Sequence, residues 1–167
     1  MESRAKFLGH PIHPVLIVFR LGLLAAAVVF DIIHLIGGSL MAAAAAYYNI
    51  AAGILGGLLA AVFGLRDWVA IPGETRAKRV GMWHGLGNVV VLLLFAASWW
   101  LRRGAPDHAP GGLAFILALA GVGLALVTGW LGGELVYRPR VAVDDGAQLD
   151  APSSLSGEPA IPPTDRS

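Results

Sequence analysis

The sequence predicts an all-α integral membrane protein, built as a four-helix bundle with a disordered C-terminal tail. The first observation is composition: 56% of the 167 residues are hydrophobic, 14% are charged, and the mean hydropathy is +0.69. These values lie outside the range of soluble domains. The second is a set of four apolar runs, each near the roughly 20 helical residues that cross a hydrocarbon core of about 30 Å. The third is a change to a polar composition, rich in Pro and Ser, near the C-terminus.

The first predicted span covers residues 14–36. Its leading proline suits the first turn of a helix, where a backbone N–H would have no partner. A basic segment precedes the run, as in a signal peptide. However, the run is too long for a cleaved h-region and contains Arg20, Asp31 and His34. We therefore expect a retained membrane span.

The remaining spans are predicted at residues 47–65, 81–101 and 112–136, with Gly and Pro in the connections. Small residues recur at every fourth position in the second and fourth spans. Such ladders let helix backbones approach closely in lipid, where van der Waals packing drives helix association. The ladders are Gly53, Gly57 and Ala61; Gly56, Ala60 and Gly64; and Gly121, Ala125, Gly129 and Gly133.

The Lys and Arg residues set the expected orientation. They gather in the N-terminal segment, in the second connection and after the fourth span, whereas the first connection has none. The positive-inside rule therefore predicts a multi-pass protein of the cell membrane with both termini in the cytoplasm. We expect residues 1–140 to form the membrane domain. Residues 141–167 have too little apolar surface to offset the entropy of ordering, so we expect a disordered cytoplasmic tail.

Several function classes are not expected. The formal net charge is +1, and the basic residues form no stripe interleaved with aromatic residues, so nucleic acid is not an expected partner. The chain has no cysteine, which excludes disulfides, thiolate metal ligands and iron–sulfur ligation. It has no nucleophile elbow, phosphate loop or dinucleotide fingerprint, so nothing in it indicates an enzyme.

Five ionisable side chains are predicted to gather at the cytoplasmic end of the bundle. Each odd span begins near a histidine, in GHPIHP and WHGLGN. Each even span ends in small residues and an acid, in GLRDW and WLGGELVYR, which makes a weak internal repeat of a helical hairpin. His84 and Asn88 are four residues apart and share a helix face. The five side chains are His10, His13, Asp67, His84 and Glu134.

The other polar groups of the spans have local interpretations. Arg20 lies about 9 Å along the helix from the start of the first span, so we expect it to snorkel towards the cytoplasmic headgroups. Asp31 and His34 are three residues apart, and they form either a local pair or part of a proton path. His108 lies in the third connection and is expected to be solvated.

The ordered set of motifs GHPIHP, GLRDW, WHGLGN and WLGGELVYR resembles the DUF2231 family of membrane proteins, over about residues 5–143. The resemblance implies a small bacterial or archaeal four-helix membrane protein. In some relatives the domain is joined to a Rieske iron–sulfur domain, which implies membrane redox chemistry. Because this chain has no cysteine, its redox partner would be a separate membrane protein or a quinone. The chain departs from the family pattern at Arg20 and Pro139, where a proline and often a histidine are expected.

Three interpretations of the polar cluster remain open. In the first, two histidines ligate b-type haem, which leaves no coordination position free and suits electron transfer. In the second, the five side chains bind a divalent ion such as zinc, manganese or iron, which is structural or transported. In the third, the cluster is a hydrogen-bonded lid on a structural or accessory subunit without a cofactor. The haem interpretation uses His84 with His13 or His10 as ligands, Asn88 beside them, and arginines that include Arg66 and Arg138 near the propionates.

The expected partners follow from the same observations. The lipid bilayer surrounds the spans in every interpretation, and a membrane redox protein or quinone is the partner in the haem interpretation. The sequence is also compatible with self-association into a homo-oligomer.

Overall fold

The protein is all-α and has the four membrane-spanning helices expected of it. The computed structural model describes residues 1–158 and 160. Within these residues the helices are α1 Ile12–Gly37, α2 Leu40–Ala70, α3 Arg76–Leu101 and α4 Gly112–Tyr137, and a short 3-10 helix, η1 Pro106–His108, precedes α4. Each of the four long helices is long and apolar enough to cross a membrane.

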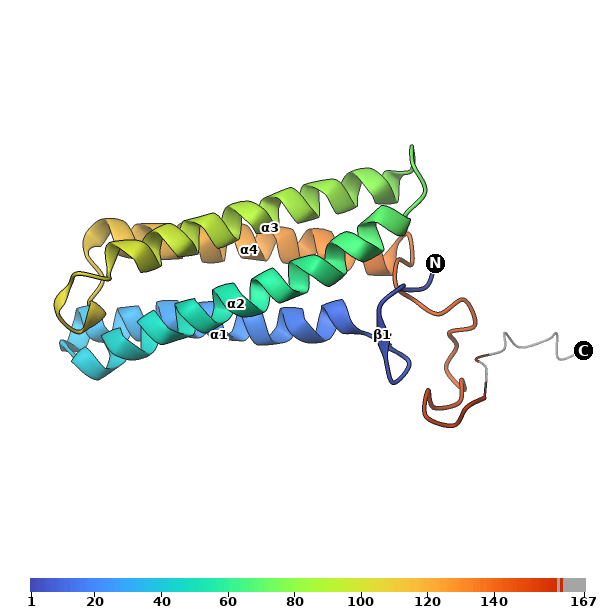
Figure 1. The fold of residues 1–167 in the computed structure, drawn as a ribbon, viewed down its shortest axis with the longest axis horizontal. Coiled ribbons are helices and arrows are strands. Elements are labelled where there is room, and N and C mark those ends of the chain that lie inside the picture. The colour runs from blue at the N-terminus through green and yellow to red at the C-terminus, as the bar shows by residue number, and fades with distance from the viewer. Residues whose placement is uncertain (159, 161–167) are drawn as a thin grey trace, which may run out of the picture.

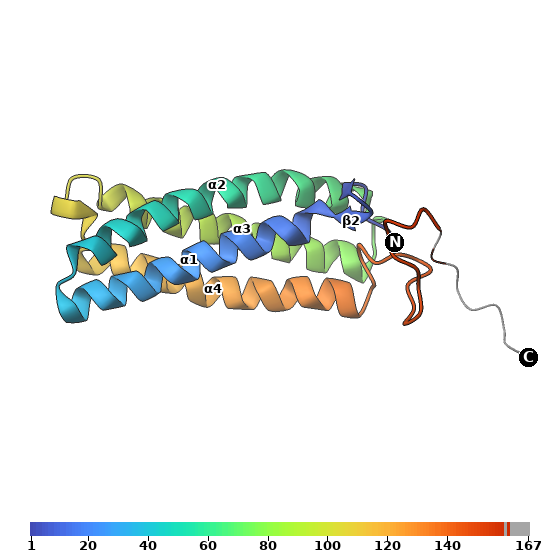
Figure 2. The ribbon, with the colours of Figure 1, turned by 90° about the horizontal axis from the view of Figure 1, so that it is seen from below.

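The helices form two antiparallel hairpins that lie side by side. α1 packs along α2, and α3 packs along α4, more extensively than either hairpin packs on the other. Figures 1 and 2 show the α1–α2 and α3–α4 connections at one end of the bundle. The N-terminus, the α2–α3 connection and the segment after α4 lie at the other end. We call the end that holds the N-terminus the terminal end and the opposite end the loop end.

A small β-hairpin precedes α1, which the sequence did not predict. Strand β1, Lys6–Phe7, pairs antiparallel with β2, His10–Pro11. Leu8 and Gly9 form the turn between them and both have positive φ, as a two-residue hairpin turn requires. The hairpin leads directly into α1 at Ile12, two residues before the predicted start at Pro14. His13 therefore lies in the first turn of α1 rather than in a loop before it.

Two helices extend further than the apolar runs predicted. α2 begins at Leu40 because Ser39 caps it by accepting a hydrogen bond from the Ala42 N–H, and it continues to Ala70 instead of residue 65. α3 begins at Arg76 rather than residue 81, because Thr75 caps it by accepting from the Lys78 N–H. The end of α2 and the start of α3 are polar helical turns, whereas the added start of α2, residues 40–46, is apolar.

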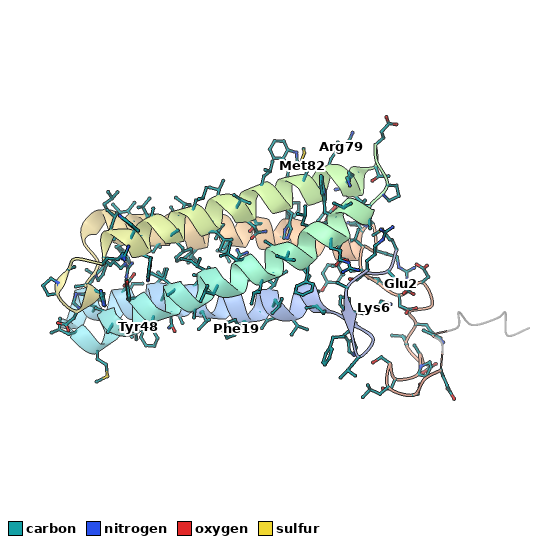
Figure 3. The ribbon with its side chains drawn as sticks, in the orientation of Figure 1. Glu2, Lys6, Phe19, Tyr48, Arg79 and Met82 are labelled. Atoms are coloured by element: carbon teal, nitrogen blue, oxygen red, sulfur yellow. The ribbon has the colours of Figure 1, made fainter. Side chains whose placement is uncertain are left out.

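The core is thin, and the outer surface is apolar. The buried centre contains small and medium side chains, among them Leu24, Ala27, Ile50, Val91 and Phe95. Large apolar side chains point outward along the whole bundle. Phe19, Tyr48 and Met82 are examples that Figure 3 labels. An apolar exterior on helices of this length is the surface that a lipid bilayer covers.

The two hairpins are related by an internal repeat. His84 follows His13 by 71 residues, and Phe95 follows Leu24 by the same 71. A Cβ at Gly53 would meet Leu24, and a Cβ at Gly121 would meet Phe95; these two glycines are 68 residues apart. Corresponding positions therefore make corresponding contacts. Because α1 and α3 begin at the same end (Figure 1), the hairpins are related by rotation about an axis along the bundle.

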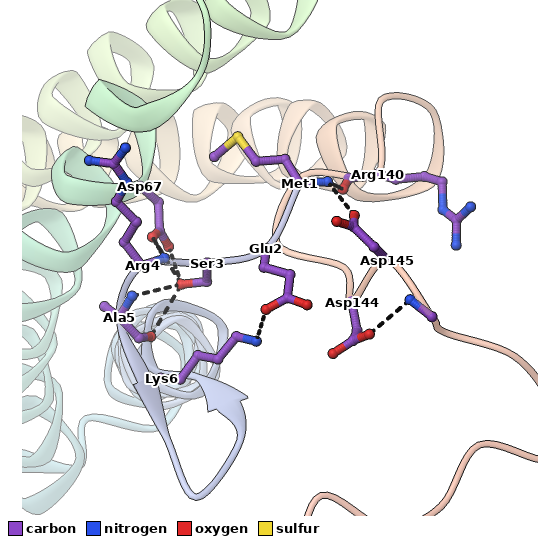
Figure 4. Close-up of polar contacts among 11 residues, drawn as sticks. Met1, Glu2, Ser3, Arg4, Ala5, Lys6, Asp67, Arg140, Asp144 and Asp145 are labelled. Atoms are coloured by element: carbon purple, nitrogen blue, oxygen red, sulfur yellow. Dashed lines mark hydrogen bonds and ion pairs between the residues drawn. The ribbon is translucent and has the colours of Figure 1, made fainter. Parts of the chain in front are cut away.

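The described part of the predicted tail contains turns but no helix or strand. Its first residues lie against the N-terminal segment. The Ala142 N–H donates to the carbonyl of Met1, and the amino group of Met1 lies 3.3 Å from the Asp145 carboxylate (Figure 4). The prediction of disorder for residues 159 and 161–167 falls outside the described residues.

Candidate functional site

The first element of the site is His13, near the start of α1. Its Nδ1 lies 2.8 Å from the carbonyl oxygen of Ala60 on α2. Because a carbonyl can only accept, Nδ1 carries the proton and donates it, which leaves Nε2 with its lone pair. Gly64, one turn further along α2, makes room for the ring: a Cβ there would lie 2.6 Å from Cε1 of His13. Among the described residues, Nε2 of His13 has no hydrogen-bond partner.

The second element, His84 on α3, repeats this arrangement in the other hairpin. Its Nδ1 lies 2.8 Å from the carbonyl oxygen of Thr128 on α4. A Cβ at Gly132, one turn after Thr128, would lie 3.0 Å from Cε1 of His84. Thr128 and Gly132 each follow their counterparts Ala60 and Gly64 by 68 residues. In each hairpin, a backbone carbonyl thus accepts a hydrogen bond from Nδ1 of the histidine, and a glycine leaves room for the ring.

The two imidazoles face each other across the boundary between the hairpins. Their ring centres are 6.4 Å apart, and the ring planes are nearly perpendicular, at 82°. Both side chains are half-buried. The His84 ring lies against His13 and the Thr128 carbonyl, inside the bundle, so His84 does not point into lipid.

Asn88 and Arg20 extend the site along the bundle. Asn88, one turn after His84, donates from Nδ2 to the His84 carbonyl at 2.8 Å, and this Nδ2 also lies 3.3 Å from Nε2 of His84. Its Oδ1 accepts from Nη2 of Arg20 at 2.7 Å and lies 3.3 Å from Oγ1 of Thr128. The predicted shared face of His84 and Asn88 is therefore present, and a side chain from α1 reaches it.

The prediction that Arg20 snorkels towards the headgroups was wrong. Arg20 is only 4% exposed, and its side chain crosses from α1 to Asn88 on α3. Gly57 on α2 leaves the space for it, since a Cβ there would lie 2.9 Å from Cδ of Arg20. The guanidinium turns inward because Oδ1 of Asn88, on the other hairpin, accepts a hydrogen bond from it.

The charge of Arg20 is not balanced within the described residues. No carboxylate forms an ion pair with it there, and its buried Nε has no hydrogen-bond partner. A guanidinium is always charged and has five N–H donors. The site therefore combines two imidazoles, each with Nδ1 bound to a backbone carbonyl, with one uncompensated cation.

Asp67 and Glu134, two other members of the predicted cluster, have hydrogen-bond partners other than the two histidines. Asp67 accepts from Ser3 Oγ, at 2.9 and 2.8 Å, and from the Arg4 N–H at 2.9 Å, and so ties the N-terminal segment to α2 (Figure 4). Glu134 accepts from Nη2 of Arg76 at 2.6 Å. In the part of the chain that is described, no three His, Asp or Glu side chains are placed to hold a metal ion.

The remaining predicted haem residues lie at the surface. His10 is exposed in β2, where Nε2 lies 3.2 Å from Oγ of Ser154. Arg66 and Arg138 are exposed at the terminal end of the bundle. The structure thus brings together His13, His84 and Asn88 from the predicted set, adds Arg20 and Thr128, and leaves His10, Arg66 and Arg138 outside.

A second buried polar group, at the loop end, overturns the predicted local pair of Asp31 and His34. Asp31 does not pair with His34. Its carboxylate makes a bidentate ion pair with Arg102, at 2.6 and 2.7 Å, and both side chains are fully buried. His34 instead hydrogen bonds the Ser39 carbonyl at 2.9 Å in the α1–α2 connection. The bidentate pair prevails because guanidinium and carboxylate have matching geometry, which an imidazole lacks.

His108 is not a freely solvated loop residue as predicted. Its ring stacks on Tyr47 of α2, with centres 3.8 Å apart, and Tyr47 stacks in turn on Trp99 of α3 at 5.2 Å. Packing of an imidazole on aromatic faces removes apolar area from water, which a histidine in an open loop would not do.

Some site residues carry no sequence signal when read one at a time. Thr128 contributes a backbone carbonyl, and Gly132 was not part of the predicted Gly129 and Gly133 ladder. The structure gives the register of the internal repeat that connects them, an offset of 68 residues that pairs Gly64 with Gly132 and Ala60 with Thr128. Alignment of the two motifs on their acids, Asp67 and Glu134, has an offset of 67 and misses these pairs by one residue.

Comparison with known proteins adds a family and nothing more specific. No curated protein and no solved structure matches the chain. The family model for DUF2231, described as a predicted membrane protein, matches residues 9–145. This range contains all four membrane-spanning helices and both histidines of the site. The chain belongs to the DUF2231 family of membrane proteins.

Proposed function

We propose that the protein is a membrane electron-transfer subunit that binds one b-type haem between its two hairpins, with His13 and His84 as axial ligands. The observation that carries this proposal is the facing pair of imidazoles, 6.4 Å between ring centres, one from each hairpin. When bound, haem ligated by two imidazoles supplies reversible one-electron transfer, because no position on the iron is left for oxygen chemistry.

The separation of the rings supports a shared iron. Two imidazoles on one metal have ring centres about 6 Å apart, since each metal–nitrogen bond is about 2.0 Å and each ligating nitrogen lies about 1 Å from its ring centre. The observed 6.4 Å agrees with this value.

The outer hydrogen bonds also support ligation. Histidines that bind a metal commonly donate the other ring N–H to a carbonyl or carboxylate, which fixes the tautomer and the ring orientation. Ala60 and Thr128 provide such carbonyls, each at 2.8 Å from Nδ1. Gly64 and Gly132 keep the space beside each ring free of side chains.

The divalent-metal alternative has weaker support. It required His10, Asp67 and Glu134 in addition to His13 and His84. In the described residues Asp67 is satisfied by Ser3 and Arg4, and Glu134 by Arg76. Two imidazoles alone are a poor site for a tightly held divalent ion, whereas they are a complete axial set for haem.

The test is a dithionite-reduced minus oxidised visible spectrum of the protein purified in mild detergent from cells supplied with iron and a haem precursor. We expect the sharp reduced bands of a low-spin b-type haem. H13A and H84A are each expected to abolish them, because each removes one axial ligand. H10A is the matched control, since His10 is exposed and outside the site, and it should leave the spectrum unchanged.

A flat spectrum from a folded wild-type protein would contradict the proposal and favour the structural-subunit interpretation. Bands that survive in both H13A and H84A would also contradict it, because the haem would then be held elsewhere. Bands lost in H10A but not in H13A would move the ligand to the β-hairpin.

We further propose that the terminal end faces the cytoplasm, so that electrons would be exchanged near that side with a quinone or a separate redox protein. The support is the excess of Lys and Arg at that end. Of two reporters fused after Val143, the one that works only in the cytoplasm should be active, and the one that works only outside the cytoplasm should be inactive. Activity of a reporter that works only outside the cytoplasm would reverse the orientation but leave the haem site unchanged.

A further inference from the structure

We propose that Arg20 makes the boundary between the two hairpins a carboxylate-binding site, and that a propionate of the haem is the carboxylate. This inference rests on the proposed haem site and deepens it, because it assigns a charge partner that the histidines do not provide. It also replaces the predicted role of Arg66 and Arg138, which are exposed at the terminal end.

The first step concerns charge. Arg20 is 4% exposed and lies within a membrane-spanning helix, where the hydrocarbon surroundings cannot solvate an ion. Buried charges in proteins are paired or coordinated, because the cost of removing an ion from water is otherwise uncompensated. Among the described residues the only side-chain acceptor for Arg20 is the neutral amide of Asn88. The cation therefore lacks an anion.

The second step concerns unused donors. The hydrogen bond to Asn88 uses Nη2, while Nε is buried and has no partner among the described residues. A carboxylate has two oxygens and is the acceptor that best matches a guanidinium. Nε of Arg102 is also buried without a partner, although Arg102 is paired with Asp31. The unbalanced charge of Arg20, more than its free donor, therefore indicates a carboxylate as the ligand group.

The third step concerns position. Arg20 is two turns after His13 on α1, so both side chains lie on the same face of that helix. Its guanidinium reaches Asn88, which itself hydrogen bonds the backbone of His84 one turn earlier on α3. Arg20 is therefore connected to both ligand histidines, and Gly57 provides the space that its side chain occupies. Haem carries two carboxylates, and this is the one buried cation beside its proposed ligands within the described residues.

The experiment measures the midpoint potential of the haem by redox titration in the wild type and in R20Q, R20K and R66Q. A cation near the haem favours the reduced form, so R20Q should lower the potential. R20K keeps the charge and should return the potential towards the wild-type value. R66Q is the matched control, because Arg66 is exposed on α2, and its potential should equal that of the wild type.

The outcomes separate this inference from the proposed function. Absence of haem from the wild type would overturn both. Haem present in all four proteins, with the same potential in R20Q as in the wild type, would overturn the role of Arg20 alone. If R20Q binds no haem, rescue by R20K supports a charge partner, whereas loss of haem in both variants means that Arg20 acts through packing and overturns the inference.

Discussion

Two pairs of polar side chains in the bundle each join residues at equivalent positions of the internal repeat, but the pairs have opposite character. His13 and His84 face each other at the terminal end, and Asp31 and Arg102 face each other at the loop end. In each pair the second residue follows the first by 71 positions. Residues related by a two-fold axis meet their own equivalents when they lie close to that axis. Both pairs therefore mark the line along which the hairpins meet.

The difference between the pairs is the balance of charge. Asp31 and Arg102 neutralise each other, and Arg102 also donates to Ser98, which in turn donates to the Ala114 carbonyl. At the histidine end, among the described residues, no carboxylate pairs with the guanidinium of Arg20, and Nε2 of His13 has no hydrogen-bond partner. The pair at the loop end is balanced in charge, although Nε of Arg102 is buried without a partner, as Nε of Arg20 is. A group left incomplete at an equivalent position indicates a ligand.

The largest expected effect is at the loop end. D31L removes the carboxylate and leaves the buried charge of Arg102 without a counter-ion. Removal of one partner of a buried ion pair costs about 3–5 kcal/mol, so the free energy of unfolding should fall by that amount. Reversible unfolding in mixed detergent micelles, followed by circular dichroism, measures it.

Two further variants complete this comparison. The double variant D31L/R102L should regain most of the loss, because apolar residues of similar size replace both charges. R20L should cost much less than D31L in the protein without haem, because it removes a charge that has no counter-ion. A loss from R20L as large as that from D31L would mean that the charge of Arg20 is compensated as well as those of Asp31 and Arg102. The proposed difference in charge balance between the two ends would then be wrong.

The sequence predicted the architecture well because a membrane imposes it. Apolar runs of spanning length and Gly and Pro in the connections located the four helices, with the largest boundary errors in α2 and α3. At the end of α2 and the start of α3, polar helical turns continue beyond the apolar run, and the start at Arg76 depends on the Thr75 cap. Hydropathy does not report such turns, whereas capping residues do. The start of α2 instead lies in the apolar residues 40–46, directly after the Ser39 cap.

The site was only partly predictable, because the sequence does not determine in which direction each side chain points from its helix. Depth along a helix follows from residue number, so His13, Asp67, His84 and Glu134 were correctly assigned to one end. The rotation of each helix about its own axis determines which of them meet, and it depends on packing between hairpins. Asp67 and Glu134 therefore found partners in Ser3 and Arg76 instead. Arg20 was misassigned for the same reason, since snorkelling assumes a residue that faces lipid.

The last prediction separates glycines that seat a histidine from glycines that only lie in the membrane. G64A places a Cβ 2.6 Å from Cε1 of His13, so the ring must move away from the Ala60 carbonyl. We expect a loss of about 1–3 kcal/mol in the free energy of unfolding, as for overpacked cores, together with reduced haem content in the reduced minus oxidised spectrum.

Gly129 on α4 provides the control, because a Cβ at this position meets no other atom within 4 Å. G129A should raise the free energy of unfolding by about 0.5–1 kcal/mol, since alanine loses less conformational entropy than glycine in a helix, and it should leave the haem spectrum unchanged. If G64A and G129A have the same effect on the free energy of unfolding and on the haem spectrum, both glycines serve only general helix packing. A haem loss confined to G64A would instead assign Gly64 to the histidine site, and with it Gly132, because Gly132 lies beside His84 as Gly64 lies beside His13.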